Sequence, residues 1–397
     1  MKKTLLMAAL AAAAVWLFGY CGNSGSGAQT WYCGADDNPR AVRATLKNEA
    51  LTVSGKGVMK DYRETRTVFE PESGVRYNDT TKDRRAECWS PWSFALEYDS
   101  TVSITDVVIE DGVTHIGNLA FAWLPDLKSI TIPASVTSIG EEALVGYHGT
   151  YAQVDTCISN LTSITVAADN AHYSSEDGIL FNKNKTILIM YPPYKQQDAY
   201  MIPKSVTDIG ERAFYHCENL TSVTIPNSVT NIGKSAFSLC KNLTSATIPG
   251  SVKSIGMAAF ARTGLKSVTI PDCVKHIQAS AFIGCKNLTS VTIPNSVESI
   301  GEFAFDECIS LTSITIPKNV RHIGWYAFSA CTNLRSVILQ RRTPPDADFA
   351  FYDFGDPIDI DIDKVCLYVP ANSIAAYRKA NVWENFKCVK AIELAPE

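Results

Sequence analysis

The sequence predicts a β-solenoid, a fold in which one short structural unit repeats along an axis. The segment Leu220-Thr-Ser-Val-Thr-Ile-Pro226 recurs every 23 residues, and once after 22. A second segment, close to Ser-Val-x-x-Ile-Gly-x-x-Ala-Phe, follows each copy. The hydrophobic content of 46% and the net charge of −5 in 397 residues are typical of a folded chain. Together the two recurring segments indicate stacked coils.

Each position of the repeat has a structural role. Val223 and Ile225 alternate with polar residues, so they share the inward face of a short strand. Pro226 ends this strand, because proline donates no hydrogen bond to a β-ladder. Ile232 points inward from a second short strand, and Phe237 fills the middle of the coil. A period of about 20 to 29 residues with this spacing is typical of leucine-rich repeats. We therefore predict a leucine-rich-repeat solenoid, β-rich, with parallel strands, short helical turns and a small N-terminal β region.

The chain divides into five predicted regions. Residues 1–21 form a signal peptide and 22–30 a flexible tether, followed by a β-rich capping region over 31–105. The solenoid covers 106–355, and 356–397 form a C-terminal capping segment. A hairpin insert is predicted near 169–193, because two β-rich runs flank Asn182-Lys-Asn-Lys185 and Gly178 marks a turn before it.

The first residues predict export. Lys2 and Lys3 precede an apolar run from Leu5 to Phe18, which is too short to span a bilayer and has the length of a signal-peptide core. The mature protein is therefore expected at the cell surface or secreted.

The end of the signal segment has two interpretations. Phe18-Gly-Tyr-Cys21 resembles a bacterial lipobox, in which Cys21 is lipidated, although Tyr20 stands where Gly or Ala is expected and Phe18 where Leu is usual. Ordinary cleavage after Ala28 is the alternative, with Ser26 and Ala28 as the small-residue pair. We favour lipidation, which makes a lipid anchor the predicted contact with a membrane.

The repeats resemble the BspA-like class of leucine-rich-repeat surface proteins. The resemblance rests on Ile-Pro-x-Ser-Val-x-x-Ile-Gly-x-x-Ala-Phe-x-x-Cys-x-Asn-Leu, best seen from Ile225 to Leu243, and covers most of the mature chain. The part from Trp31 to Trp92 resembles the β region that precedes such repeats, and the part from Val369 onward resembles their closing segment. The resemblance implies an exported surface protein linked to adhesion and interaction, with no catalytic residues to carry over.

Cysteines occupy one recurring slot of the repeat. Stacked strands lie about 5 Å apart, but side chains in one slot point in parallel, so we predict a buried ladder of free thiols. The ladder comprises Cys217, Cys240, Cys285, Cys308 and Cys331. Export permits disulfides elsewhere, and the two candidate pairs are Cys33 with Cys88 and Cys366 with Cys388.

Two other residue types suggest metal sites and are interpreted otherwise. Asp359, Asp361 and Asp363 would share a strand face and are a weak calcium candidate, but Lys364 stands where an EF-hand needs glycine. A solvated acidic edge is the favoured interpretation. Three histidines share one repeat position and are predicted to be polar corner residues facing solvent; they are His115, His276 and His322. No metal or other cofactor is predicted.

No motif predicts an enzyme. The chain has no phosphate-binding loop and no dinucleotide-binding motif, and the run Gly22–Gly27 does not complete a Gly-x-Ser-x-Gly elbow. The mild net charge gives no reason to expect a nucleic-acid partner.

The outward strand face is the predicted binding surface. It carries a ladder of hydroxyls, namely Ser222, Thr224, Ser245, Thr247, Ser267, Thr269, Ser290, Thr292, Ser313 and Thr315. Ser and Thr are also simply β-compatible polar residues, so the ladder by itself names no ligand. We predict a non-enzymatic surface protein that binds a protein ligand on a host, a matrix or a neighbouring cell. The alternative is a secreted glycan-binding protein that uses the same ladder.

Overall fold

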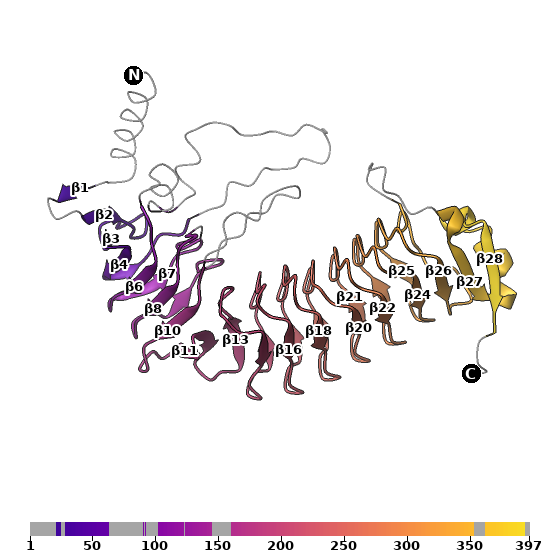
Figure 1. Ribbon diagram of the computed structural model, residues 1–397, viewed down its shortest axis with the longest axis horizontal. Coiled ribbons are helices and arrows are strands. Elements are labelled where there is room, and N and C mark those ends of the chain that lie inside the picture. Colours follow the sequence, from indigo (N-terminus) through magenta and orange to yellow (C-terminus); the bar gives the residue numbers. More distant parts are fainter. Residues whose placement is uncertain are drawn as a thin grey trace, which may run out of the picture. The chain divides into compact units, whose positions relative to one another are not determined.

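The computed structural model describes residues 21–24, 28–62, 90, 92, 102–122, 124–144, 160–352 and 362–393 (Figure 1). The chain forms two compact units, Met1–Lys183 and Asn184–Glu397. Most of the predicted signal peptide, residues 1–20, lies outside the described residues. Within the described ranges, no helix has the length and apolar character needed to cross a membrane.

Two sheets lie wholly within the described part of the first unit. The larger sheet begins with an antiparallel meander and continues with parallel strands; it comprises β1 (Cys21–Ser24), β2 (Ala28–Tyr32), β3 (Val42–Lys47), β4 (Ala50–Gly55), β6 (Asp106–Ile109), β8 (Ser129–Ile132) and β10 (Ser163–Val166). The smaller sheet is parallel and comprises β5 (Gly57–Val58), β7 (Val113–Ile116) and β9 (Ser138–Ile139). Parallel pairing therefore begins at β4 and β5, inside the region predicted as a cap, so the cap ends in a coil of its own.

Part of the predicted tether is in strands. β1 pairs antiparallel with β2, with Cys21 opposite Thr30 and Ser24 opposite Ala28. The edge strand β2 presents unpaired backbone groups, and pairing with an adjacent segment satisfies them. The described residues of the segment predicted as a tether, 22–24 and 28–30, thus belong to β1 and β2.

The first unit also contains a tight antiparallel hairpin. β11 (Tyr173–Glu176) pairs with β12 (Ile179–Asn182). Asp177 and Gly178 connect them with φ angles of 51° and 76°. Positive φ at both residues is what a two-residue hairpin turn requires, and Asp-Gly is one of the pairs that adopts it readily. This hairpin lies within the predicted insert, at the turn that Gly178 indicated.

The second unit contains two series of parallel strands (Figure 1). The first series forms three sheets, made of β14 (Ala199–Met201), β16 (Ser222–Thr224) and β18 (Ser245–Thr247); β20 (Ser267–Thr269) and β22 (Ser290–Thr292); and β24 (Ser313–Ile316), β26 (Ser336–Leu339), β27 (Cys366–Pro370) and β28 (Cys388–Ile392). The second series comprises β13 (Ile187–Met190), β15 (Asp208–Ile209), β17 (Asn231–Ile232) and β19 (Ser254–Ile255), then β21 (His276–Ile277), β23 (Ser299–Ile300) and β25 (His322–Ile323). Short helices near the C-terminus are η1 (Ile362–Lys364), η2 (Ala371–Ser373), α4 (Ile374–Tyr377) and η3 (Trp383–Asn385).

A column of stacked phenylalanines forms the core of the second unit. One ring from each coil lies on the next, with centroid separations from 4.8 to 5.6 Å and nearly parallel planes; the rings are Phe214, Phe237, Phe260, Phe282, Phe305, Phe328 and Phe351. Each of these side chains is buried. The turn that carries each ring is held by the next coil, as when the Phe237 amide donates to the Ala259 carbonyl at 2.7 Å. The prediction that phenylalanine fills the middle of each coil is confirmed.

Large aromatic residues cover the ends of the core within each unit. In the second unit, Trp383 and Phe386 meet Phe351 edge to face, at 5.6 and 5.3 Å. In the first unit, Trp92 stacks on Phe121 at 5.8 Å, and its indole nitrogen donates to the Ala120 carbonyl. These contacts shield apolar faces that no further coil covers. The predicted leucine-rich-repeat solenoid, with parallel strands, little helix and an N-terminal antiparallel β region, is confirmed.

Candidate functional site

The predicted hydroxyl ladder lies on the first series of strands in the second unit. We call it the hydroxyl face, and it consists of Ser222, Thr224, Ser245, Thr247, Ser267, Thr269, Ser290, Thr292, Ser313 and Thr315. Strand register aligns like residues where pairing is recorded, with Ser222 beside Ser245 and Thr269 beside Thr292. Eight of these side chains are exposed, whereas Ser222 and Thr315 are half-buried. The structure therefore places the predicted residues together on one open surface.

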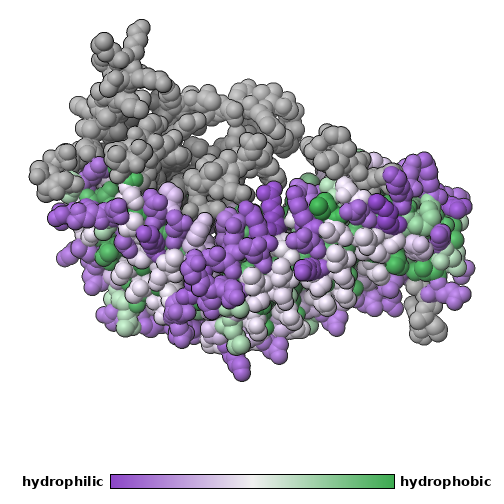
Figure 2. Space-filling model, in the orientation of Figure 1, coloured by the Kyte–Doolittle hydropathy of each residue, from purple (hydrophilic) through white to green (hydrophobic). Residues whose placement is uncertain are grey.

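Larger side chains bound the hydroxyl face in the direction in which the coils stack. Met201 continues the threonine row on one side, opposite Thr224, and 72% of its surface is exposed. On the other side Ile338 lies beside Thr315, and Tyr368 and Lys390 follow in register. The threonine row thus has small polar side chains in the middle and bulky side chains at both ends. Figure 2 shows mainly pale and purple residues, and no broad hydrophobic patch, over the middle coils.

The hydroxyls of this face are available for a ligand. Among them, all of which the structure describes, only Ser313 has a recorded partner, the hydroxyl of Ser336 at 2.7 Å. The neighbouring threonine slot differs, since Thr244 donates to the Thr221 carbonyl of the preceding coil. A free hydroxyl offers one donor and two acceptor lone pairs. Such groups recur from one parallel strand to the next, about 4.7–4.9 Å apart, and suit an extended ligand with many polar groups.

The cysteine ladder is buried. Four of its thiols donate to phenylalanine carbonyls of the preceding coil, as from Cys240 to Phe214 at 2.9 Å and from Cys308 to Phe282 at 3.3 Å, whereas Cys217 donates to the Tyr191 carbonyl. Burial raises the pKa of the Cys308 thiol well above its ordinary value, and raises that of Cys285 to about 11. A thiol that stays protonated is a poor nucleophile and a poor metal ligand.

The candidate disulfide cysteines have different positions. Cys366 and Cys388 lie opposite each other on β27 and β28 and form a disulfide, with their Cα atoms 4.6 Å apart. Cys33 is a buried free thiol whose pKa is raised by burial to about 12, and Cys88 lies outside the described residues. The Cys21 backbone belongs to β1, and its lipidation stays a prediction.

The carboxylates suspected of binding calcium are only partly described. Asp359 and Asp361 lie outside the described residues, whereas Asp363 forms an ion pair with Lys387. Across the described ranges, no group of three or more His, Cys, Asp and Glu side chains is placed to hold a metal ion. The calcium site therefore has no structural support from the described residue of the three.

The three corner histidines link neighbouring coils. His276 lies 2.9 Å from the Ser299 hydroxyl, and His322 lies 3.3 Å from the Asp346 carboxylate. Both side chains are exposed, as predicted for polar corner residues. Each contacts the coil that follows it, so their role is to connect coils.

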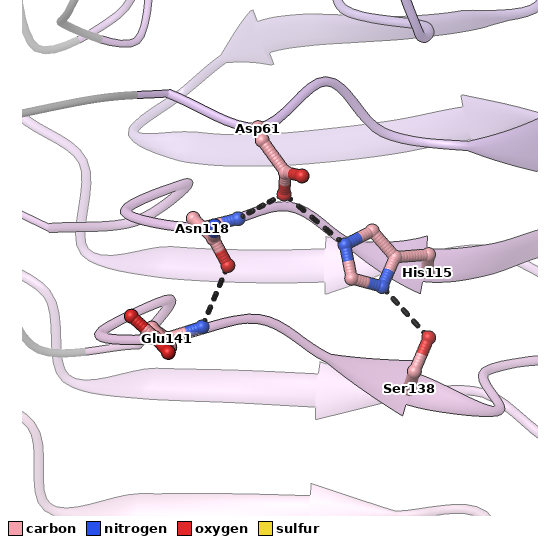
Figure 3. A network of polar contacts seen from close by, with 5 residues as sticks. All are labelled: Asp61, His115, Asn118, Ser138 and Glu141. Atoms are coloured by element: carbon pink, nitrogen blue, oxygen red, sulfur yellow. Dashed lines mark hydrogen bonds and ion pairs between the residues drawn. The ribbon is translucent and has the colours of Figure 1, made fainter.

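His115 belongs to a network that joins the cap to the first repeat (Figure 3). Asp61, which follows β5, accepts hydrogen bonds from the Asn118 amide at 2.8 Å and from His115 at 3.3 Å. The Asn118 side chain accepts in turn from the Glu141 amide at 2.7 Å, and His115 also contacts Ser138. Asp61 and Asn118 therefore have the same role, because the side chain of each accepts a hydrogen bond from a backbone amide of the coil that follows it. Sequence analysis did not identify this residue, because its partners are more than 50 residues away along the chain.

Sequence analysis also missed an exposed aromatic cluster in the second unit. Its members are Trp325, Phe349 and Tyr352, and we call it the aromatic turn surface. The Trp325 and Phe349 centroids lie 6.2 Å apart, and those of Phe349 and Tyr352 lie 5.7 Å apart, both pairs edge to face. A comparison of the same slot in every coil would have revealed Trp325, because the equivalent residues of the other coils are not aromatic; they are Glu211, Lys234, Met257, Ala279, Glu302 and Asp348.

Comparisons with known proteins agree with this architecture. A model of the BspA type leucine rich repeat region matches residues 96–176, 195–283 and 253–376, in six copies. No curated protein matches this chain.

Several solved structures are similar to this chain. A leucine-rich repeat protein from Eubacterium ventriosum ATCC 27560 is 25% identical over 76% of this chain and 94% of that one, with a TM-score of 0.39. The pneumococcal vaccine antigen PcpA is 23% identical over 75% of this chain and 65% of that one, with a TM-score of 0.49. A leucine rich cell surface protein from Faecalibacterium prausnitzii A2-165 is 30% identical over 59% of this chain and 60% of that one, with a TM-score of 0.41. The chain spans less than two thirds of the length of the latter two. The match of the family model to most of the sequence, together with the stacked coils, shows that this chain belongs to the BspA-type leucine-rich-repeat family.

Proposed function

We propose that this protein is a non-enzymatic, exported surface protein that binds a protein ligand through the hydroxyl face. One observation carries the proposal: the face presents aligned rows of hydroxyls, nearly all of them without intramolecular partners. Extended faces of this kind are the surfaces that solenoid proteins use for binding. The family supports the same function, because leucine-rich-repeat chains serve generally as binding scaffolds.

The chemistry of the face supports binding rather than catalysis. A serine or threonine nucleophile needs an adjacent base to activate it. The register neighbours of the hydroxyl-face residues are other hydroxyls and apolar side chains, such as Ser245 beside Ser222 and Met201 beside Thr224. The thiols of the cysteine ladder, which could supply a stronger nucleophile, are buried.

Lysine substitutions along the face would test this proposal. The variant Thr247→Lys, Thr269→Lys and Thr292→Lys introduces three long cations into consecutive coils. A matched control is Asn227→Lys, Ser254→Lys and Asn295→Lys, which adds the same charge at exposed positions outside the face. Both variants should fold, because none of the six side chains is buried.

The readout is binding of the mature chain to an array of purified extracellular-matrix proteins and, in parallel, to an array of glycans. We expect the wild type and the control to retain one or more protein ligands, and the face variant to lose them by at least about tenfold, as disruption of a central contact region does. Binding that survives in the face variant would exclude the hydroxyl face. A signal confined to the glycan array would replace the protein ligand by a carbohydrate.

Surface display is proposed to depend on lipidation of Cys21. Metabolic labelling with a fatty-acid probe should mark the wild type and leave Cys21→Ala unlabelled. A wild-type chain that carries no label and appears in the medium would overturn the anchor and support ordinary cleavage near Ala28.

A further inference from the structure

The aromatic turn surface leaves three large rings exposed to solvent. Trp325 and Phe349 expose 53% and 52% of their surfaces. Behind them, the rings of Phe303 and Tyr326 stack at 5.2 Å. Burial of an aromatic side chain is strongly favourable. A cluster of half-exposed aromatic rings is therefore unusual and is typical of an interaction site.

Other coils show that the fold does not require aromatic residues here. The slot that holds Phe303, Tyr326 and Phe349 is filled in earlier coils of the second unit by Arg212, Ser235, Ala258 and Ser280. The backbone conformation is the same in all of them, with φ between 53° and 57°. Bulky side chains are uncommon at positive φ, which disfavours L-residues. Three consecutive aromatic residues at this position therefore point to a ligand rather than to folding.

Charge changes in the same coils. The turn segments 302–308, 325–331, 348–352 and 381–385 contain five acidic residues and no Lys or Arg; the five are Glu302, Asp306, Glu307, Asp348 and Glu384. The equivalent segments of earlier coils, 211–217, 234–240, 257–263 and 279–285, contain one acidic residue, Glu211, and three basic ones, Arg212, Lys234 and Arg262. The turn edge thus goes from basic to acidic where it becomes aromatic.

Acidic residues flank the most exposed ring. Glu302, Trp325 and Asp348 occupy one slot in three successive coils, so an acidic residue lies one coil away from Trp325 on each side. Asn381 donates to Asp348 at 2.8 Å, and Asn385 donates to the Tyr352 hydroxyl at 2.9 Å. These contacts hold the rim of the surface in place. An aromatic face attracts a cation through its negative quadrupole, and tryptophan does so best.

We propose that the aromatic turn surface binds a basic segment of a protein partner, with an arginine side chain stacked on Trp325 between Glu302 and Asp348. The planar guanidinium can lie on the indole face while its edge donates to carboxylates, which a lysine ammonium does less well. This site is separate from the hydroxyl face, so it stands whether or not that face binds a ligand.

A defined peptide would test the site with the full mature chain. The probe is a fluorescein-labelled Gly-Arg-Gly-Arg-Gly peptide, followed by fluorescence anisotropy at low ionic strength. Replacement of both arginines by citrulline keeps the planar shape and removes the charge, and replacement by lysine keeps the charge and removes the plane. We expect binding of the arginine peptide, weaker binding of the lysine peptide by a few fold, and loss of binding with citrulline.

Matched variants locate the contact. Trp325→Ala should weaken arginine-peptide binding by about tenfold, and Asp348→Asn should weaken it and reduce its dependence on salt. Met257→Ala is the control, because Met257 occupies the Trp325 slot three coils earlier and is 44% exposed. Circular dichroism checks that each variant is folded, and Phe349→Leu provides a second aromatic deletion.

The proposal is overturned if the wild type does not bind the arginine peptide, or if the citrulline peptide binds equally well. It is also overturned if folded Trp325→Ala and Phe349→Leu bind as tightly as the wild type, or if Met257→Ala weakens binding as much as Trp325→Ala.

Discussion

Removal of one ring from the phenylalanine column should divide the second unit into two parts that unfold separately. Phe260 is fully buried, and its ring stacks on Phe237 at 5.1 Å and on Phe282 at 5.6 Å, with planes within 6° of parallel. Phe260→Ala removes both stacking contacts and leaves a cavity in the middle of the coil. From the range for buried phenylalanine and the two ring pairs lost, we expect a loss of about 4 kcal/mol.

The loss of stability in Phe260→Ala should be confined to the coils around residue 260. In a solenoid each coil contacts only its neighbours, so stability is roughly a sum of coil and interface contributions. A weak coil at Phe260 uncouples the coils before it from those after it. A domain has only about 5–15 kcal/mol of stability in total, so a loss of this size should change the shape of the unfolding curve.

Urea denaturation followed by circular dichroism would measure the loss, and hydrogen exchange with mass spectrometry would locate it. We expect a broadened or two-step transition for Phe260→Ala, with faster exchange in the coils next to residue 260. Phe260→Leu, which keeps most of the volume, should show a smaller loss. Met257→Ala in the same coil should change stability by less than about 0.5 kcal/mol, since Met257 is exposed. A loss below about 1 kcal/mol in Phe260→Ala, or an unchanged single transition, would refute the reasoning.

Three further outcomes are expected. Replacement of Cys366 and Cys388 by serine should cost about 3 kcal/mol, from the closure entropy of a 22-residue separation, with faster hydrogen exchange confined to the C-terminal cap; exchange that is unchanged there would contradict this. Alkylation of the native protein at mildly alkaline pH should modify the exposed Cys273 and spare Cys308, whose pKa is raised by burial, as peptide mapping would show; equal labelling would contradict the buried ladder. Hydrogen bonds from Ser129 and Thr105 lower the pKa of Asp106 from its ordinary value of 3.8. The ionised Asp106 carboxylate therefore stabilises the folded state above that pH, and this stabilisation is lost as the pH falls through the lowered pKa. The small melting-temperature difference between wild type and Asp106→Asn should therefore shrink between about pH 6 and about pH 2.5, and a constant difference would argue against it.

Sequence analysis identified the coils well because the pattern is repeated. Val223, Ile232 and Phe237 were placed inward from alternation and spacing alone, and all three are buried. Each slot recurs in several coils, so a residue that is ambiguous in one coil is interpreted from its equivalents in the others. The hydroxyl face followed from the same spacing, because parallel strands in register carry equivalent residues to one side.

Features outside the repeat could not be derived in this way. Trp92 covers Phe121 and donates to Ala120, and Asp61 contacts His115 and Asn118, across long stretches of chain that carry no shared pattern. The pairing of β1 with β2 also depends on an unsatisfied strand edge, which a run of small residues does not indicate.

The sequence by itself determined the period, the inward and outward slots, the buried thiol ladder and the position of the hydroxyl rows. The tertiary structure alone decided which hydroxyls stay without partners, how the cap joins the first coil, and that Trp325, Phe349 and Tyr352 form one exposed surface. The physical reason is that periodicity specifies the environment of a slot within one coil. Contacts between residues that differ from coil to coil arise only when stacking brings those coils together.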